Sequence, residues 1–165
     1  MGIKSYIVNF LKFLKHGGVK YVSVTFTNPD ARYTNKKVFI SGGSEGLGRA
    51  MAKAYLAEGA EVIVTGRSKE KLSNFQLSES NAKLHTLVWD ALDFDSYKQK
   101  FDKAVSMMGR IDIFVNNVGG GMSKYEPWNA YTAEVLDRTY DINTKSMFLM
   151  CQMEGLYMIV FRSVE

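Results

Sequence analysis

The sequence predicts an α/β fold in which helices cover both faces of a doubly wound parallel sheet. From Lys37 onward, short apolar segments of strand length alternate with segments of helical length, which is the pattern of strand–helix–strand units in parallel sheets. A glycine-rich stretch at residues 41–48 lies between the first of these strands and the first helix. The right-handed crossovers of such units place helices on both faces of the sheet.

The expected elements follow one another in a regular order. We expect strands where apolar and β-branched residues predominate, at residues 37–40, 61–65, 84–89 and 111–115. Helices are expected from about residue 50 to the stop at Gly59, and over about 69–75, 93–108 and 130–151. Residues 158–161 are a candidate for a further strand.

The composition is that of one globular domain. The 165 residues are 46% hydrophobic and 23% charged, with two prolines, which excludes a disordered or collagen-like chain. The single cysteine, Cys151, excludes an internal disulfide and favours a reducing compartment, so we predict a cytoplasmic protein. No apolar run reaches the roughly 18 residues that a membrane-spanning helix needs.

The net charge of +4 is unevenly distributed. Residues 1–37 hold seven basic residues and one acidic residue, whereas the rest of the chain holds fourteen basic and sixteen acidic residues. The basic character therefore belongs to the N-terminal segment, and the high isoelectric point is no sign of nucleic-acid binding by the main domain. We expect no nucleic-acid partner.

Residues 1–36 are predicted to form an extension and a linker ahead of the domain. Apolar side chains between Ile3 and Leu14 recur with the spacing of an amphipathic helix, and lysines lie off that face. Three interpretations stay open: an extension packed on the domain or on a neighbouring subunit, which we favour, a helix bound to a membrane surface through residues 1–16, or a cleaved targeting peptide. Residues 19–36 have the composition of a linker, with a short β-like stretch at 21–26.

Gly42, Gly46 and Gly48 suit a phosphate-binding loop. They follow a strand and precede a helix, and there a tight turn exposes backbone N–H groups to a pyrophosphate at the positive end of the helix. A side chain at these positions would hold the backbone away from the phosphates. The sequence therefore predicts a dinucleotide-binding domain, and a simple glycine turn is the alternative.

The spacing Gly-x-x-x-Gly-x-Gly resembles that of the short-chain dehydrogenase/reductase family. The family signature Thr-Gly-x-x-x-Gly-x-Gly is matched by residues 41–48, with serine in the place of threonine. The resemblance implies a Rossmann fold over residues 37–165 that is incomplete at its C-terminus. It also implies that the loop binds NAD(P)(H) through Ser41, Gly42, Ser44, Gly46, Leu47 and Gly48.

Two further family motifs that concern the cofactor follow in the expected order. Asp90, with Ala91, stands where the family places an aspartate beside the adenine ring. Residues 116–119 resemble the family's Asn-Asn-Ala-Gly motif, which implies that the cofactor is contacted by Asn117, Val118 and Gly119. The simpler alternatives are a loop cap for Asp90 and a strand-end turn for the asparagine pair.

Asn143 is the one catalytic residue that the resemblance implies. It stands in Tyr-Asp-Ile-Asn, where the family has a helix asparagine that supports the proton relay. An asparagine facing solvent on a helix is the alternative.

Arg67 favours NADP(H) over NAD(H). It stands 19 residues beyond Gly48, where an NAD-preferring protein places a carboxylate for the ribose 2′-hydroxyl and an arginine accommodates a 2′-phosphate. Ser68 adds a second donor. Glu45 argues against this preference, because NADP-using relatives often carry a basic residue there. The alternative for Arg67 is a solvated residue that caps a helix.

The acid/base pair of the family is missing from the sequence. The family carries it as Tyr-x-x-x-Lys beyond the Asn143 helix, with a serine before it. The one such spacing here, Tyr33 with Lys37, precedes the first strand and is a coincidence. Ser163 is the candidate for the serine. We therefore expect a C-terminally truncated chain that is inactive or nearly so.

Truncation would leave one face of the Asn143 helix uncovered. Phe148, Leu149 and Met150 would then be exposed and prone to aggregation. Cys151, in the same segment rich in methionine and leucine, is expected to be a buried small apolar residue rather than a nucleophile.

The favoured function is NAD(P)(H)-dependent oxidoreduction of a small carbonyl or alcohol substrate. This chain is expected to retain the cofactor-binding half of such an enzyme. A catalytically inactive nucleotide-binding or regulatory remnant is the second hypothesis, and a protein anchored at a membrane surface by the N-terminal helix is the third. A homo-oligomer is a further expectation. No metal is expected, because His16 and His85 have no partners at ligand spacing, and Asp90 with Asp93 suits loop polarity.

Overall fold

The computed structural model describes residues 32–79, 81–121 and 131–162. The elements in these residues are, in chain order, β1 (Lys37–Ser41), α2 (Gly46–Ala57), β2 (Glu61–Gly66), α3 (Lys69–Glu79), β3 (Leu84–Val88), the 3-10 turn η2 (Phe94–Ser96), α4 (Tyr97–Met108), β4 (Ile113–Asn116), α5 (Ala133–Tyr140), the π-helical turn η4 (Asp141–Lys145) and α6 (Ser146–Arg162).

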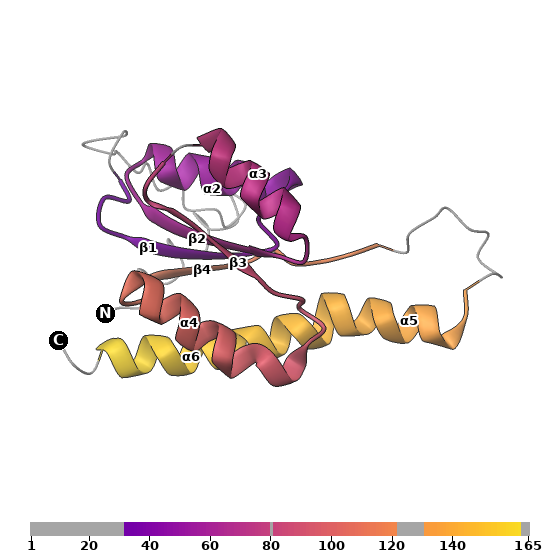
Figure 1. Ribbon diagram of the computed structural model, residues 1–165. Coiled ribbons are helices and arrows are strands. Elements are labelled where there is room, and N and C mark those ends of the chain that lie inside the picture. The colour runs from indigo at the N-terminus through magenta and orange to yellow at the C-terminus, as the bar shows by residue number, and fades with distance from the viewer. Residues whose placement is uncertain (1–31, 80, 122–130, 163–165) are drawn as a thin grey trace, which may run out of the picture.

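The four strands are parallel and lie in the order β3-β2-β1-β4. Helices α2 and α3 cover one face of the sheet, and α4 and α6 cover the other (Figure 1). This arrangement confirms the predicted doubly wound α/β fold. Strands β1 and β2 are buried on both faces, which explains why they contain continuous apolar runs instead of alternating ones.

The sheet separates two clusters of buried side chains. Phe39 and Ile63 belong to one cluster, together with Phe101 of α4 and Met150 of α6. Their neighbours along the strands belong to the other cluster, with side chains of α2 and α3: Val38, Ile40, Val62, Val64, Ala52, Leu56, Leu72 and Phe75. This division follows from the strand geometry, in which successive side chains point to opposite faces.

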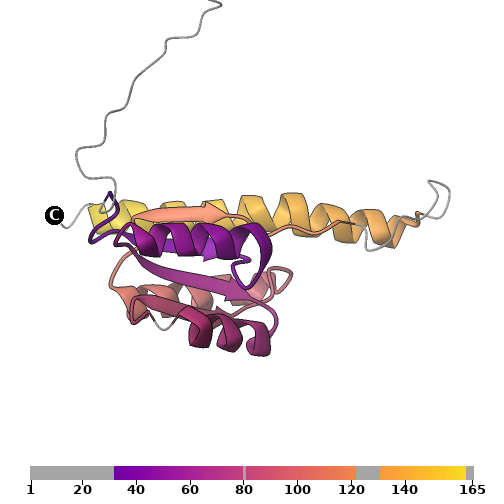
Figure 2. The ribbon, with the colours of Figure 1, turned by 90° about the horizontal axis from the view of Figure 1, so that it is seen from above.

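The last described segment is one long helical rod. Elements α5, η4 and α6 follow one another without a break. The rod lies along the sheet, and its α5 end projects past the strands (Figure 1 and Figure 2). This projecting end forms a wall beside the carboxyl-terminal ends of the strands.

The secondary structure of the rod differs from the prediction. The helix predicted to end near Cys151 continues to Arg162, so residues 158–161 are helical and form no strand. Met150, Met153 and Tyr157 all contact the buried cluster on this face of the sheet, and their spacing is that of one helical face. An apolar run suits a helix or a strand by periodicity alone, and here the packing decides. Ser163 lies outside the described residues.

The burial of α6 also differs from the expectation. Met150 is 1% exposed and Leu149 is partly buried, so Phe148, at 69%, is the only fully exposed member of the three. Cys151 is exposed, not buried. One step along a helix turns a side chain by about 100°, which carries Cys151 away from the face of Met150. Among the described residues, no helix is long and apolar enough to cross a membrane.

The end of the predicted linker lies against the domain. Tyr33 packs edge-on against Tyr55 of α2, with ring centroids 4.8 Å apart, and Arg32 forms an ion pair with Glu58. The helix and the β-like stretch expected within residues 1–31 lie outside the described residues. The division of the chain at residue 36 stays a prediction.

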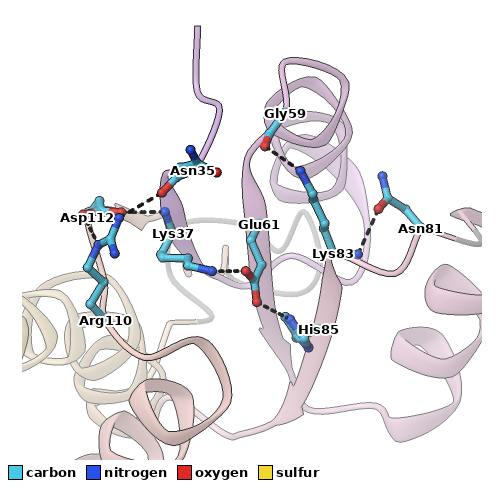
Figure 3. Close-up of polar contacts among 9 residues, drawn as sticks. All are labelled: Asn35, Lys37, Gly59, Glu61, Asn81, Lys83, His85, Arg110 and Asp112. Carbon is cyan, nitrogen blue, oxygen red and sulfur yellow. Dashed lines mark hydrogen bonds and ion pairs between the residues drawn. The ribbon is translucent and has the colours of Figure 1, made fainter. Parts of the chain in front are cut away.

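Charged side chains join the amino-terminal ends of the strands (Figure 3). Glu61 of β2 contacts Lys37 of β1 and His85 of β3, the latter at 2.8 Å. Asp112, just before β4, accepts a hydrogen bond from the backbone N–H of Lys37 at 2.8 Å. Burial alone would raise the pKa of Glu61, but the hydrogen bonds with Lys37 and His85 outweigh it and lower that pKa.

The substitution Glu61→Gln is expected to lower the free energy of unfolding by about 1 kcal/mol at pH 7, and by much less near pH 3. A carboxylate whose pKa is lowered by folding stabilises the fold above its ordinary pKa of 4.5. That contribution is lost as the pH falls through the lower, folded-state pKa. Urea denaturation of both proteins at the two pH values measures it. An equal cost at both would show that the charge of Glu61 contributes nothing.

Candidate functional site

A cleft of about 900 Å³ lies at the carboxyl-terminal end of the sheet. Its walls come from the segments that follow β1, β2, β3 and β4, and from α5 and η4. Strands β1 and β4 are neighbours, and the helices that follow them lie on opposite faces of the sheet. Such a topological switch point is the usual position of a ligand in open α/β sheets.

The cleft brings together residues from distant parts of the sequence. It is lined by most of the predicted cofactor residues, namely Gly42, Ser44, Leu47, Gly48, Arg67, Ser68, Asp90, Ala91, Asn117, Val118 and Gly119. Ser41, Gly46 and Asn143 do not line it. The sequence prediction missed other lining residues, among them Lys71, Trp89 and a row on α5 and η4 that includes Arg138.

The glycine loop is folded tightly between β2 and the first turn of α2. Gly42 has a φ of 70°, a left-handed conformation that favours glycine. The N–H of Gly43 donates to the carbonyl of Thr65 at 2.8 Å and fixes the loop to the end of β2. A Cβ on Gly48 would lie 2.3 Å from the carbonyl oxygen of Gly42, so only glycine allows this approach. The first turn of α2 thereby lines the cleft.

Ser41 and Asn117 tie β1 to the end of β4. Ser41 is fully buried, and its Oγ accepts hydrogen bonds from the backbone N–H groups of Asn117 at 3.0 Å and Val118 at 3.1 Å. The Nδ2 of Asn117 donates to the carbonyls of Ser41 at 3.2 Å and Gly42 at 2.8 Å. Ser41 therefore holds the loops beneath the cleft, and Asn117 combines this structural role with a place in the wall.

Asn143 holds the loop that follows β4. Its Oδ1 accepts a hydrogen bond from the N–H of Gly120 at 3.1 Å, and its Nδ2 donates to the carbonyls of Gly120 at 2.7 Å and Thr139 at 2.9 Å. Both amide protons are thus used within the protein. The side chain is not simply solvent-facing, and its direct effect is on the position of the cleft rim at Gly120.

Charged and polar side chains gather where β2 leads into α3. The Oγ of Ser68 accepts a hydrogen bond from the backbone N–H of Lys71 at 3.2 Å, so Ser68 and not Arg67 caps α3. The Nζ of Lys71 lies 2.7 and 2.9 Å from the two carboxylate oxygens of Glu45. Lys71 was hard to assign to the cleft from the sequence. It stands four residues after Arg67, and this spacing brings two side chains together only when both lie inside one helix.

Two hydrogen bonds fix the loop that follows β3. Asp90 lines the cleft, and its Oδ1 accepts a hydrogen bond from the N–H of Leu92 at 3.0 Å, so Asp90 also caps the loop. The hydroxyl of Tyr97 donates to the carbonyl of Ala91 at 2.6 Å. Burial raises the pKa of Tyr97 to about 12, so this hydroxyl keeps its proton near neutral pH.

Comparisons with known proteins agree with one another. A family model described as "short chain dehydrogenase" matches residues 36–163. The chain is 31% identical over 124 residues to a 7α-hydroxysteroid dehydrogenase of Bacteroides fragilis, and 35% identical over 127 residues to levodione reductase of Leifsonia aquatica. Each alignment covers 74% of this chain, but only 46% and 47% of the two relatives. The chain therefore spans about half the length of these curated relatives.

Two solved structures share the fold of this chain over about half of their own length. The crystal structure of levodione reductase has a TM-score of 0.70 and 32% identity, with 77% of this chain and 50% of that chain covered. A 3-ketoacyl-(acyl-carrier-protein) reductase from Brucella melitensis, complexed with NADH, has a TM-score of 0.70 and 26% identity, with 75% and 50% covered.

Proposed function

The chain belongs to the short-chain dehydrogenase family, and from this premise we propose that it is the cofactor-binding half of an NAD(P)(H)-dependent oxidoreductase acting on a carbonyl or alcohol. The observation that carries the proposal is the cleft at the switch point of the sheet, where the glycine loop, the loop of Asp90 and the loop of Asn117 meet. Its volume of about 900 Å³ suits a ligand as large as a dinucleotide.

The residues of the cleft fit such a cofactor. Gly42 and Gly48 keep the loop free of side chains at the first turn of α2, whose N–H groups and positive dipole end would bind the pyrophosphate. Asp90 and Ala91 would bind the adenine side, and Val118 with the glycines after it would form the other rim. When bound, the nicotinamide ring supplies or accepts the hydride. Asn143 would contribute as a positioning residue through its bonds to Gly120.

NADP(H) is the proposed cofactor form. Arg67 and Ser68 line the cleft beyond β2, where a 2′-phosphate of the adenine ribose would lie. A hydrogen bond to a charged group of this kind contributes about 1.5–3 kcal/mol. The negative charge of Glu45, which argues against a phosphate, is paired with Lys71. The relative from Brucella melitensis is complexed with NADH, so both cofactors belong in the test.

The proposed activity of these 165 residues alone is low. No Tyr-x-x-x-Lys motif follows Asn143 in the sequence, and a positioned proton donor typically contributes about 10²–10⁴-fold in rate. A nucleotide-binding or regulatory protein is the second candidate, because binding requires only the cleft. Substrate-dependent oxidation of NADPH separates the two. A cytoplasmic location, a homo-oligomer and a membrane contact through residues 1–16 stay predictions.

NADPH is expected to raise the melting temperature of the chain markedly, and NADH is expected to raise it much less. A ligand at 100 times its Kd stabilises a fold by about 2.7 kcal/mol, which shifts the melting temperature of a domain of this size by several degrees. Differential scanning fluorimetry with NADPH, NADH or neither is the measurement. A cooperative transition that is indifferent to both cofactors would reject the nucleotide site. Equal shifts with both would keep the site and reject the preference.

A further inference from the structure

We propose that Lys71 is the second cation of the 2′-phosphate site, and that Glu45 is its internal counterion, which a 2′-phosphate must displace. The inference rests on the proposed function, since it assigns two residues of the same cleft to one group of the cofactor. It explains how a chain with an acidic residue in its glycine loop can still accept a phosphorylated ribose.

The geometry points to Lys71 because it shares one short segment with Arg67 and Ser68. Arg67 directly follows β2, Ser68 caps α3, and Lys71 lies in the first turn of that helix. All three line the cleft. Arg67 forms no ion pair or hydrogen bond with any residue that the structure describes. A phosphate placed between Arg67 and Ser68 would therefore have Lys71 as its next cationic neighbour.

Lys71 is paired with Glu45 of the glycine loop. The Nζ of Lys71 lies 2.7 and 2.9 Å from the two carboxylate oxygens of Glu45, the residue just before α2. The side chains of Lys71 and Glu45 are 53% and 67% exposed, so water screens the pair and its disruption costs little. A phosphate group carries a charge of about −1.5 to −2 at pH 7 and offers three oxygens, and it therefore outcompetes a single carboxylate for the same ammonium group.

The experiment measures binding of 2′-phospho-ADP-ribose and ADP-ribose to the full chain by isothermal titration calorimetry. These two ligands lack the nicotinamide and differ only in the 2′-phosphate. The variants are Lys71→Gln, Glu45→Gln and the double substitution. Lys69→Gln is the matched control, because Lys69 lies in the same turn of α3 and carries the same charge but does not line this cleft.

Lys71→Gln is expected to weaken 2′-phospho-ADP-ribose about tenfold and ADP-ribose less than about twofold. Glu45→Gln is expected to tighten the phosphorylated ligand about threefold relative to ADP-ribose, because Lys71 is then free. The double variant is expected to bind it better than Lys71→Gln alone, since no unpaired carboxylate remains. Lys69→Gln is expected to change either affinity less than about twofold.

The outcomes separate this inference from the function on which it rests. If the native chain binds neither ligand, the proposed nucleotide site is wrong, and the role of Lys71 is wrong with it. If the native chain binds both, but Lys71→Gln and Glu45→Gln change the two affinities by equal factors, the pair only joins α2 to α3. The nucleotide site would then stand and the inference would be overturned.

Discussion

Replacing Phe101 with alanine is expected to lower the free energy of unfolding by about 3–5 kcal/mol. Phe101 is fully buried on α4 and lies at the centre of a group of rings. Its ring stacks on Phe39 of β1 at 5.2 Å between centroids and on Tyr157 of α6 at 5.7 Å, and it meets Trp89 edge-on at 5.6 Å. One side chain therefore connects the sheet to the rod, and its removal leaves a cavity that three elements share.

The measurement is equilibrium denaturation in urea, followed by circular dichroism. Phe148→Ala is the matched control, because it is the same substitution at a side chain that is 69% exposed on α6. Its expected effect is below about 0.5 kcal/mol. Equal losses for the two variants would contradict the burial of Phe101 between the sheet and α6. A small loss for Phe101→Ala would show that Phe101 is not buried between the sheet and α6 in solution.

Gly48→Ala is expected to abolish the NADPH-induced rise in melting temperature. The added Cβ would lie 2.3 Å from the carbonyl oxygen of Gly42 and 2.6 Å from the Nδ2 of Asn117, closer than real Cβ contacts. The first turn of α2 must then move away from the glycine loop, and the N–H groups that would bind a pyrophosphate move with it. The overpacking is also expected to lower the free energy of unfolding by about 1–3 kcal/mol.

Gly155→Ala provides the control for this substitution. A Cβ at Gly155 in α6 meets nothing within 4 Å, and alanine is the better helix former by about 0.5–1 kcal/mol. Gly155→Ala should therefore melt at the same or a higher temperature and should keep the full response to NADPH. A Gly48→Ala variant that responds to NADPH like the native chain would show that this close approach is not needed for binding.

Much of the fold could be predicted from the sequence because its signals are local. Each of the four predicted strands corresponds to an observed strand, with ends that differ by at most two residues. Apolar runs and glycines carry this information without any reference to the rest of the chain. The glycine loop, Arg67 and Asp90 could also be placed together, because each follows a predicted strand and the carboxyl ends of parallel strands lie at one edge of the sheet.

The sequence alone determined the parallel sheet, the glycine loop at the start of α2 and eleven of the 24 residues that line the cleft. Only the tertiary structure decided that α6 runs on to Arg162, that Cys151 faces outward and that Lys71 pairs with Glu45. An apolar run becomes a helix or a strand according to what it packs against, and the partner here is Phe101 of α4. Glu45 and Lys71 are 26 residues apart in sequence, and their contact depends on how α2 and α3 lie on the sheet, which no local pattern encodes.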